Sequence, residues 1–442
     1  MSVRKPMITA ALLFVWLAVA SAAGKSATAN EGQNDEPKLW ALLVAGSNGY
    51  DNYRHQADIC HAYHVLRNHG IPDEQIVVMM YDDIANNPQN PTPGVIINHP
   101  NGSNVYPGVP KDYTGKLVTP KNFLSILQGK KVKGGSGKVI ASGPNDHVFV
   151  NFADHGAPGL IAFPEDDLHA KPFVNVIKKM HKQKKFAKMV IYIEACESGS
   201  MFDGLLPSNV NVYATTAANP DESSYACYMD DYRQVYLGDV YSVKWMEDSD
   251  REDLHKETLI DQYKLVKKET TTSHVMEYGD MNLGKLPVSE FQGEKDAQRI
   301  VVPDAPLDAV SSRDVPIAIL QHKLRKASSP AAKRSIMRKL QLALRRRSFL
   351  DDKVAQIASI ISENNEESTR ALLSEKRPLR DFDCYERAVR HFSAHCFNLS
   401  KNPYALGRLR VLVNMCEMEY DIEDITDAMD LACTHKPVAG IV

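Results

Sequence analysis

Short apolar runs alternate with stretches of helical spacing along the first part of the chain. The runs lie at residues 40–45, 76–81, 147–153, 189–193 and 210–215. Apolar residues of the intervening segments 58–68 and 173–180 recur every three or four positions, as on one face of a helix. This strand–helix–strand alternation predicts an α/β fold with a mostly parallel sheet flanked by helices.

The pattern changes after Gly293. Residues 301–316 carry repeated Pro and Asp, which predicts an extended linker. Residues 323–347 are strongly basic, contain no acidic residue and place Leu, Ile and Met at helical spacing, and residues 351–430 are helical in pattern. A basic amphipathic helix is typical of membrane or nucleic-acid binding, but we favour a solvated face against an acidic neighbour. Residues 86–113, rich in Pro, Asn and Gly, predict a long surface loop.

Composition and termini narrow the class of protein. The 442 residues carry a net charge of -3, which gives no indication of a nucleic-acid partner. Residues 1–22 have the charged, apolar and small-residue order of a secretory signal peptide, and no later stretch is long enough to span a membrane. We therefore expect a protein of the secretory pathway.

The cysteines divide into two groups. Seven is an odd number, so at least one thiol has no partner within the chain. Cys60, Cys196 and Cys227 are scattered, whereas four more crowd the C-terminal end, which predicts a disulfide-stapled C-terminal domain. Asn101 and Asn398 begin triplets that are glycosylation acceptors in secreted proteins.

Two strand ends carry candidate chemistry. The run at 189–193 leads to Cys196, and the run at 147–153 leads to His155, each followed by small residues. Parallel strands deliver both side chains to one edge of the sheet, where open α/β folds bind their ligands. A thiol nucleophile needs a neighbouring base and an oxyanion site, so we predict that Cys196 and His155 form a catalytic pair.

Cys196 and His155 also have simpler structural interpretations. A lone buried Cys is commonly an inert small hydrophobe, and a strand-end His is commonly a hydrogen-bonded surface group. A zinc site would need three or four clustered ligands, and no Cys/His pair of metal spacing lies near Cys196. We therefore predict no metal and no cofactor.

Six short motifs stand out along the chain: AGSNG at 45–49, NYRHQAD at 52–58, DHG at 154–156, EACESGS at 194–200, YATTAANP at 213–220 and ESSYAC at 222–227. At these motifs the chain resembles the legumain family, the asparaginyl endopeptidases among the caspase-like cysteine peptidases. The likeness runs from about residue 39 to the C-terminus.

The resemblance implies roles residue by residue. Cys196 matches the nucleophile, His155 the acid/base and Asn52 the asparagine that orients the histidine. The N–H groups of Gly156 and Cys196 would form the oxyanion hole. Asp154 matches an aspartate that the family converts to a succinimide in connection with peptide ligation.

The family's preference for Asn implies a pocket that offers both a donor and acceptors, because a carboxamide carries both kinds of group. The resemblance assigns Arg54 to the amide oxygen, with Glu194 and Asp239 at the amide nitrogen. From the sequence alone, Arg54 would be interpreted as a surface charge and Asp239 as the cap of a helix or strand. We expect the pocket to accept Asp as well at acid pH. The walls would be His55, Ser223 and Ser224.

The resemblance also implies a domain order: a signal peptide at 1–22, a caspase-like catalytic domain at 23–300, a linker or activation peptide with the basic helix at 301–350, and an inhibitory helical prodomain at 351–442. The prodomain cysteines would pair Cys384 with Cys416 and Cys396 with Cys433. Family members cut themselves after Asn or Asp in the linker. No Asn occurs between Asn282 and Asn364, so Asp308 and Asp314, or another protease acting within the basic stretch, are the expected routes.

We therefore expect a cysteine endopeptidase made as a zymogen, which cuts protein or peptide substrates after Asn. Its prodomain and cystatin-type inhibitors are the partners that the resemblance implies, with a lysosomal, endosomal, digestive or secreted location. One alternative is a thiol acyltransferase like the glycosylphosphatidylinositol transamidase subunit, whose C-terminal membrane span is missing from this sequence. The other is a catalytically silent binding protein on the same fold.

Overall fold

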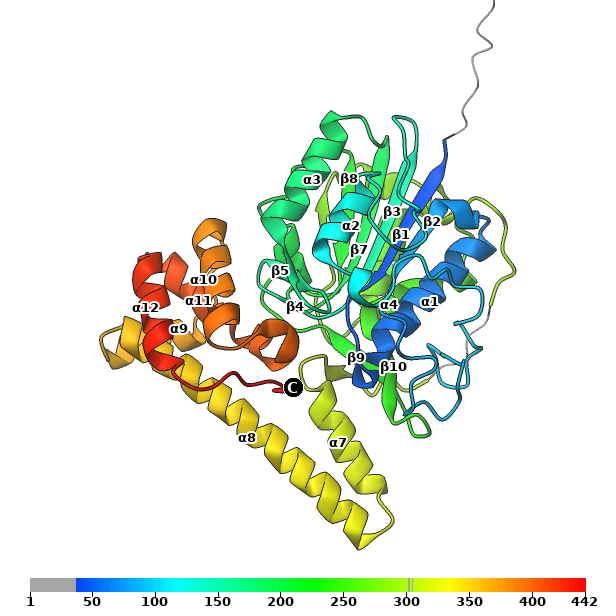
Figure 1. Ribbon diagram of the computed structural model, residues 1–442. Helices are drawn as coiled ribbons and strands as arrows, with labels where there is room; N and C mark the ends of the chain where they lie inside the picture. The colour runs from blue at the N-terminus through cyan, green and yellow to red at the C-terminus, as the bar shows by residue number, and fades with distance from the viewer. Residues whose placement is uncertain (1–36, 301–302, 304) are drawn as a thin grey trace, which may run out of the picture. The chain divides into compact units, whose positions relative to one another are not determined.

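The five predicted apolar runs form five strands of a central six-stranded sheet, whereas the sequence did not predict the sixth strand, at residues 276–279 (Figure 1). The computed structural model describes residues 37–300, 303 and 305–442, so the predicted signal peptide lies outside the described residues. Neighbouring strands follow the order β11-β8-β7-β3-β1-β2; β11 is antiparallel to β8 and the other pairs are parallel. The predicted mostly parallel sheet is thus confirmed. The strands are β1 (Leu39–Ala45), β2 (Ile76–Met79), β3 (His147–Ala153), β7 (Lys188–Glu194), β8 (Val212–Thr216) and β11 (Met276–Gly279).

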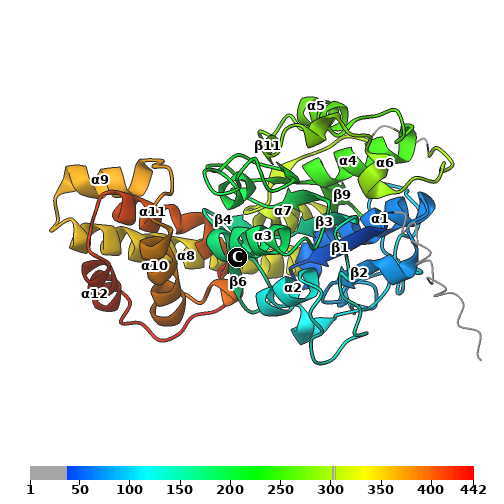
Figure 2. The ribbon, with the colours of Figure 1, turned by 90° about the horizontal axis from the view of Figure 1, so that it is seen from above.

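Helices cover both faces of this sheet, because successive strand residues point to opposite sides and both sides are apolar. Leu43 of β1 enters one core, and its neighbour Leu42 enters the other. Figure 2 shows α2 and α3 across the strands from α4 and α5. One core contains residues of α1 (Tyr53–Asn68), α4 (Val240–Arg251), α5 (Leu259–Glu269) and α6 (Ser289–Gln292), and the other contains residues of α2 (Pro120–Leu127) and α3 (Ala170–Lys182).

The long loop at 86–113 differs in part from its prediction. It contains no named helix or strand, as expected, but it is not confined to the surface. Ile96 and Tyr113 are fully buried, and the Asn98 amide donates to Asp58 at 2.7 Å. The loop is held because its buried polar groups have partners, which a purely solvated loop does not need.

Small sheets and the linker lie beside the central sheet. The predicted extended linker contains β12 (Val310–Ser311), which pairs antiparallel with β9 (Tyr225–Asp230), so part of it belongs to a sheet. β9 also pairs with β10 (Val235–Asp239), and β4 (Gly156–Ala157), β5 (Leu160–Ala162) and β6 (Asp167–His169) form another small sheet.

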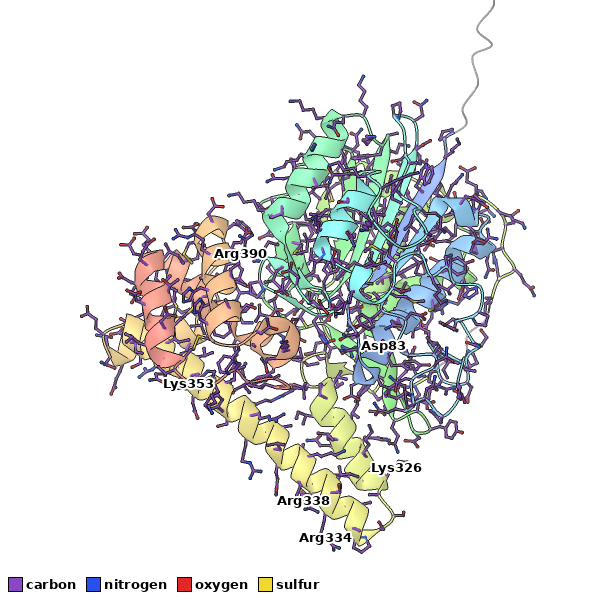
Figure 3. The ribbon with its side chains drawn as sticks, viewed as in Figure 1. Asp83, Lys326, Arg334, Arg338, Lys353 and Arg390 are labelled. Carbon is purple, nitrogen blue, oxygen red and sulfur yellow. A yellow bond between two sulfur atoms is a disulfide. The ribbon has the colours of Figure 1, made fainter. Side chains whose placement is uncertain are left out.

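The basic stretch is two helices rather than one. α7 (Val315–Lys326) ends before residues 327–329, and α8 (Pro330–Ile361) begins where Ser329 Oγ accepts from the Ala332 N–H at 3.1 Å. Ile317, Leu340 and Ala343 pack the two helices together. α8 also continues past residue 350, the position at which the resemblance placed the boundary between linker and prodomain. Arg334 and Arg338 are exposed on α8 (Figure 3).

The C-terminal region is helical, as expected. Disulfides join Cys384 to Cys416 and Cys396 to Cys433, the pairing that the family resemblance implies, and the remaining three cysteines are free. Within the described part of the chain, no helix is both long and apolar enough to cross a membrane. The elements are α9 (Glu366–Ser374), α10 (Phe382–His395), η7 (Pro403–Arg408), α11 (Arg410–Glu417) and α12 (Ile422–Ala432).

Candidate active site

Cys196 and His155 emerge from neighbouring parallel strands. The last residue of β3, Ala153, pairs with the last residue of β7, Glu194, so both chains leave the sheet at one edge. Cys196 is 1% exposed, and its Sγ lies 3.2 Å from Ser223 Oγ. The sheet edge predicted from the sequence therefore does bring the thiol and the imidazole into one region.

Asn52 fixes the His155 ring. Asn52 Oδ1 lies 3.0 Å from His155 Nε2, so an Nε2–H donor leaves Nδ1 as the basic nitrogen. Burial, together with the charges of Arg54 and Arg313, lowers the pKa of His155 to about 3. The imidazole is therefore neutral near physiological pH, the form that can accept a proton.

Gly156 allows a close backbone approach. A β-carbon at this position would lie 2.2 Å from the Cys196 carbonyl oxygen, a distance that real β-carbons do not reach. The absence of a side chain is therefore what lets the β4 backbone lie against the end of β7.

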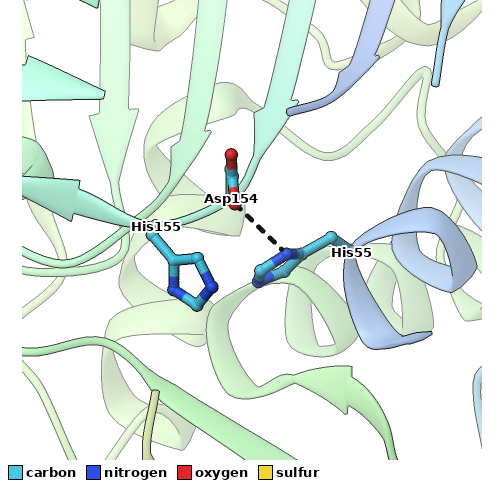
Figure 4. Close-up of side chains that lie close together, drawn as sticks. All are labelled: His55, Asp154 and His155. Atoms are coloured by element: carbon cyan, nitrogen blue, oxygen red, sulfur yellow. Dashed lines mark ion pairs between the residues drawn. The ribbon is translucent and has the colours of Figure 1, made fainter. Parts of the chain in front are cut away.

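A second imidazole lies beside the first. His55 Nδ1 is 3.4 Å from Asp154 Oδ1 (Figure 4) and 2.7 Å from Ser47 Oγ, and its ring meets His155 edge-to-face at 5.1 Å. His55, Asp154 and His155 offer ligand atoms within 4.8 Å of one another, a cluster that sequence spacing did not reveal. Ser47 and Asn52 already occupy one nitrogen of each ring, so we describe a hydrogen-bonded network and assign no metal to it.

Arg54 and three carboxyl groups form a buried polar cluster. Arg54 Nε donates to Asp239 Oδ1 at 2.8 Å, and Glu194 Oε2 accepts from the N–H and the hydroxyl of Ser242 at 3.0 and 3.1 Å. Four buried atoms of this cluster have no hydrogen-bond partner among the described residues: Arg54 Nη2, Asp58 Oδ2, Glu194 Oε1 and Asp239 Oδ2. Arg54 Nη2 and the carboxyl oxygens of Glu194 and Asp239 therefore remain for a bound polar group, while Asp58 and Asp239 also share a side-chain hydrogen bond.

Burial changes the protonation of the cluster. It raises the pKa of Glu194 and Asp58 well above the usual values, and the Asp239 carboxylate raises both further. Burial also raises the pKa of Asp239, although the Arg54 guanidinium opposes this shift. Three carboxyls facing one guanidinium thus hold protons more firmly than exposed carboxyls do.

The linker lies against these groups. Ser311 Oγ is 2.8 Å from Ser223 Oγ, and the Ser312 N–H donates to the Ser224 carbonyl at 3.0 Å. Asp308 accepts from the Tyr228 N–H at 2.8 Å, and Asp314 pairs with Arg347 at 2.6 Å. Both expected cleavage residues are thus engaged in contacts away from the Arg54 cluster.

Within the linker, Arg313 lies against the nucleophile candidate. Its guanidinium pairs with Glu197, the residue after Cys196, and adjoins the Cys196 side chain. A β-carbon at Gly407 of η7 would lie 2.2 Å from Arg313 Nη1, so glycine makes room for the arginine. The linker thereby places a cation beside the Cys196 thiol.

The C-terminal helices cover the same edge. Ala157 and Leu160 share one hydrophobic core with Tyr385 of α10. Arg410 Nη2 lies 2.6 Å from Asp221 Oδ1, and a cavity of about 110 Å³ separates His155 from residues of η7. From the basic stretch, Lys326 pairs with Asp231 of the catalytic region at 2.8 Å, and Arg410 and Arg313 add charged contacts from outside that stretch.

The sequence did not indicate several residues that contact the candidate site. Asp58 and Ser242 contact site residues across long sequence separations, whereas Ser47 contacts His55 only eight positions away. Asp58 lies within one of the matching motifs, but the resemblance assigned it no role. Arg313 gave no signal of its own, since it stands in a linker already rich in charge.

Comparison with known proteins gives the class. Residues 39–294 match the model of the peptidase C13 family, and residues 338–433 match the legumain prodomain model. Together with the fold, these matches define a cysteine-type endopeptidase that carries a C-terminal helical prodomain.

The chain belongs to the peptidase C13 family of legumain-type enzymes. It is 52% identical to human legumain over 95% of this chain and 98% of that protein. It is 46% identical to the hemoglobinase of Schistosoma japonicum, over 90% and 94% of the two chains, and 43% identical to the Arabidopsis thaliana vacuolar-processing enzyme beta-isozyme, over 92% and 88%. A structural match to caspase-1 from Spodoptera frugiperda, with 11% identity, covers 59% and 92% of the chains at a TM-score of 0.34.

Proposed function

We propose that the protein cleaves peptide bonds after Asn by acyl transfer at Cys196. The thiolate attacks the scissile carbonyl, and the Gly156 and Cys196 N–H groups stabilise the oxyanion. His155, oriented by Asn52, takes up the thiol proton and gives it to the leaving amine. Water, or an incoming amine in a ligase reaction that involves Asp154, then resolves the thioester.

The single observation that supports the Asn preference is the set of unpartnered atoms beside Arg54. A carboxamide oxygen accepts from Arg54 Nη2, while its nitrogen donates to Glu194 and Asp239. His55, Ser223 and Ser224 form the walls. Sites built for a polar group reject analogues that lack it, by about 10⁴-fold or more.

Acid pH extends the specificity to Asp in this proposal. A charged P1 carboxylate would face the raised-pKa carboxyls of Glu194 and Asp239. A protonated P1 carboxyl presents a donor and an acceptor, as a carboxamide does. The same acidity favours an endosomal, lysosomal or digestive compartment of the secretory pathway, reached through the predicted signal peptide.

The test uses matched fluorogenic peptides, Ala-Ala-Asn and Ala-Ala-Asp, with the processed protein from pH 4 to pH 7. Hydrolysis should require Cys196 and His155, and the Asp-to-Asn ratio should rise as pH falls. Glu194→Gln should reduce this pH dependence more than Glu290→Gln, a carboxyl outside the pocket. A ratio that does not change with pH would contradict the specificity proposal, and activity in Cys196→Ser would contradict the mechanism.

In the same proposal, prodomain release starts at Asp308 or Asp314. Asp308 is bound to the β9 backbone and Asp314 to Arg347, so the linker must detach first or be cut by another enzyme molecule. Sequencing the new termini of the acid-treated protein tests this. If the protein with both Asp308→Ala and Asp314→Ala matured normally by itself, self-cleavage at these residues would be ruled out.

Glycans at Asn101 and Asn398 are part of the same proposal. Asn101 and Asn398 are both exposed, as glycan attachment requires.

A further inference from the structure

Two histidines and an aspartate cluster on the prodomain, away from the active site. His391 and His395 stand four residues apart on α10, and Asp430 lies on α12. Residues four apart occupy the same face of a helix. His391 Nε2 lies 2.8 Å and His395 Nδ1 3.6 Å from Asp430 Oδ1. One carboxylate oxygen thus faces a nitrogen from each ring.

We propose that His391, His395 and Asp430 bind a divalent zinc ion that joins α10 to α12. Their three ligand atoms lie within 4.8 Å of one another. Ligands of a tetrahedral zinc ion sit roughly 3.3 Å apart, given metal–ligand bonds of about 2.0–2.2 Å. Two imidazoles and a carboxylate form a donor set suited to zinc, and the fourth position goes to water.

A disulfide already fixes the two helices that carry the cluster. Cys396 directly follows His395, Cys433 lies three residues after Asp430, and these cysteines form a disulfide with a Cα–Cα distance of 5.0 Å. The disulfide holds the two helices together beside the ligands, so little backbone ordering remains to be done when the ion binds. Such preorganisation favours binding.

The side chains are free to turn toward a shared ion. The two rings stack in parallel at 4.1 Å, so at least one must rotate before both nitrogens point at the same metal. The side chains of His391, His395 and Asp430 are 21%, 56% and 52% exposed, which leaves space for that rotation and for the water ligand.

The local charge favours a cation. α12 carries four carboxylates and no Lys or Arg between its ends. The nearest arginines of α10 are themselves paired, Arg387 with Glu423 and Arg390 with Glu386. Asp427 stands one turn before Asp430 on the exposed side of α12 and adds negative charge. Because both arginines are paired with carboxylates, the carboxylates of α12 determine the local charge and favour a bound cation.

The test measures zinc bound to the full-length zymogen. The Cys196→Ser background prevents self-cleavage and removes the catalytic thiol as a competing ligand. After dialysis against Zn²⁺, His395→Gln and Asp430→Asn should each lose one zinc ion per chain, or bind it at least tenfold more weakly. His255→Gln should retain it, because His255 lies outside the prodomain cluster, with Asp296 3.8 Å away.

Two further measurements keep the test decisive. Co²⁺ bound at this site should give the absorption of four-coordinate cobalt without a thiolate band. Zn²⁺ should raise the melting temperature of the parent and not that of His395→Gln, whose metal-free melting should match the parent. Equal zinc content in parent and variants, or none in the parent, would overturn the proposal and leave an ordinary histidine–aspartate ion pair.

Discussion

At the scale of single residues, the candidate pocket is marked by buried polar side chains that lack hydrogen-bond partners. Arg54 and Glu194 are almost completely buried, yet each keeps an atom without a hydrogen-bond partner among the described residues. Leaving buried polar atoms unpaired costs about 1–3 kcal/mol each. Such a cost persists where a bound group supplies the missing partner, which is why these residues support a substrate pocket.

Gly156→Ala should lower kcat by about 10²–10³-fold, the effect of losing one oxyanion donor. The added methyl would lie 2.2 Å from the Cys196 carbonyl oxygen and must displace one of the two backbones. The matched control is Gly143→Ala, whose methyl would meet nothing nearer than Asp146 Oδ2 at 3.8 Å. Activity of the processed Gly156→Ala protein within about twofold of the control would contradict this role.

Asp167 should make stability depend on pH. Burial raises its pKa to about 7, against about 3.9 in an unfolded chain. A raised folded-state pKa adds stability that is complete below about pH 3.9 and is lost as pH rises through about 7. In a Cys196→Ser background, Asp167→Asn should therefore gain stability relative to its parent as pH rises across that window.

Urea unfolding at several pH values measures this difference. Asp352→Asn, at an exposed position on α8, is the control and should keep a constant difference from the parent. A parallel pH dependence of the parent and Asp167→Asn would show that Asp167 does not carry the effect.

At the scale of elements, the linker segment 308–314, which includes β12, lies over the proposed substrate site. β12 pairs with β9 beside Ser223 and Ser224, so the linker uses backbone groups of the kind that an extended substrate pairs with. Asp308 bonded to β9 and Asp314 bonded to Arg347 hold the two ends of this segment. Arg313 lies between them and meets Glu197.

Arg313→Ala should expose the nucleophile in the intact zymogen. Removing the guanidinium breaks the contact with Glu197 and opens the space beside Cys196. Alkylation of Cys196 by iodoacetamide should accelerate by about tenfold, the factor that corresponds to 1.4 kcal/mol. Arg334→Ala, on the exposed face of α8, should leave the rate unchanged. Equal rates in both variants would show that Arg313 does not shield the thiol.

At the scale of the whole molecule, the described chain from Pro37 to Val442 forms one unit in which the prodomain shares a core with the catalytic region. Ala157 and Leu160 belong to the strands that follow His155, and they pack with Tyr385. The charged contacts of Arg313 and Arg410 surround this apolar contact. Release of the prodomain must therefore expose apolar surface as well as separate charges.

The disulfides should set the stability of the prodomain. Each closes a loop of more than thirty residues, with sequence separations of 32 and 37. Loop-closure entropy gives about 3–4 kcal/mol for loops of this size. In a Cys196→Ser background, Cys384→Ser with Cys416→Ser should shift prodomain unfolding, followed by proteolysis of the C-terminal helices, to lower urea. Unfolding of the central sheet, followed by the fluorescence of Trp40 and Trp245, serves as the internal control. Equal shifts of both transitions would contradict this separation.

The sequence by itself determined five of the six strands of the central sheet, their parallel arrangement and the placement of the thiol and the imidazole at one sheet edge. These features follow from local periodicity, because a strand buried on both faces must be apolar throughout and its end must become polar. The likeness of the motifs added the pocket residues and the cysteine pairing. It did not indicate the break between α7 and α8, which follows from the Ser329 cap and Pro330.

Only the tertiary structure decided which distant groups meet. Arg313 reaches Glu197 because Gly407, 94 positions further along the chain, leaves the space, and no local pattern encodes that contact. The same holds for Asp58 beside Asp239 and for Asp430 beside His391, which lie on separate elements. Such contacts depend on how packed elements place side chains in three dimensions, whereas periodicity reports only which face of an element is buried.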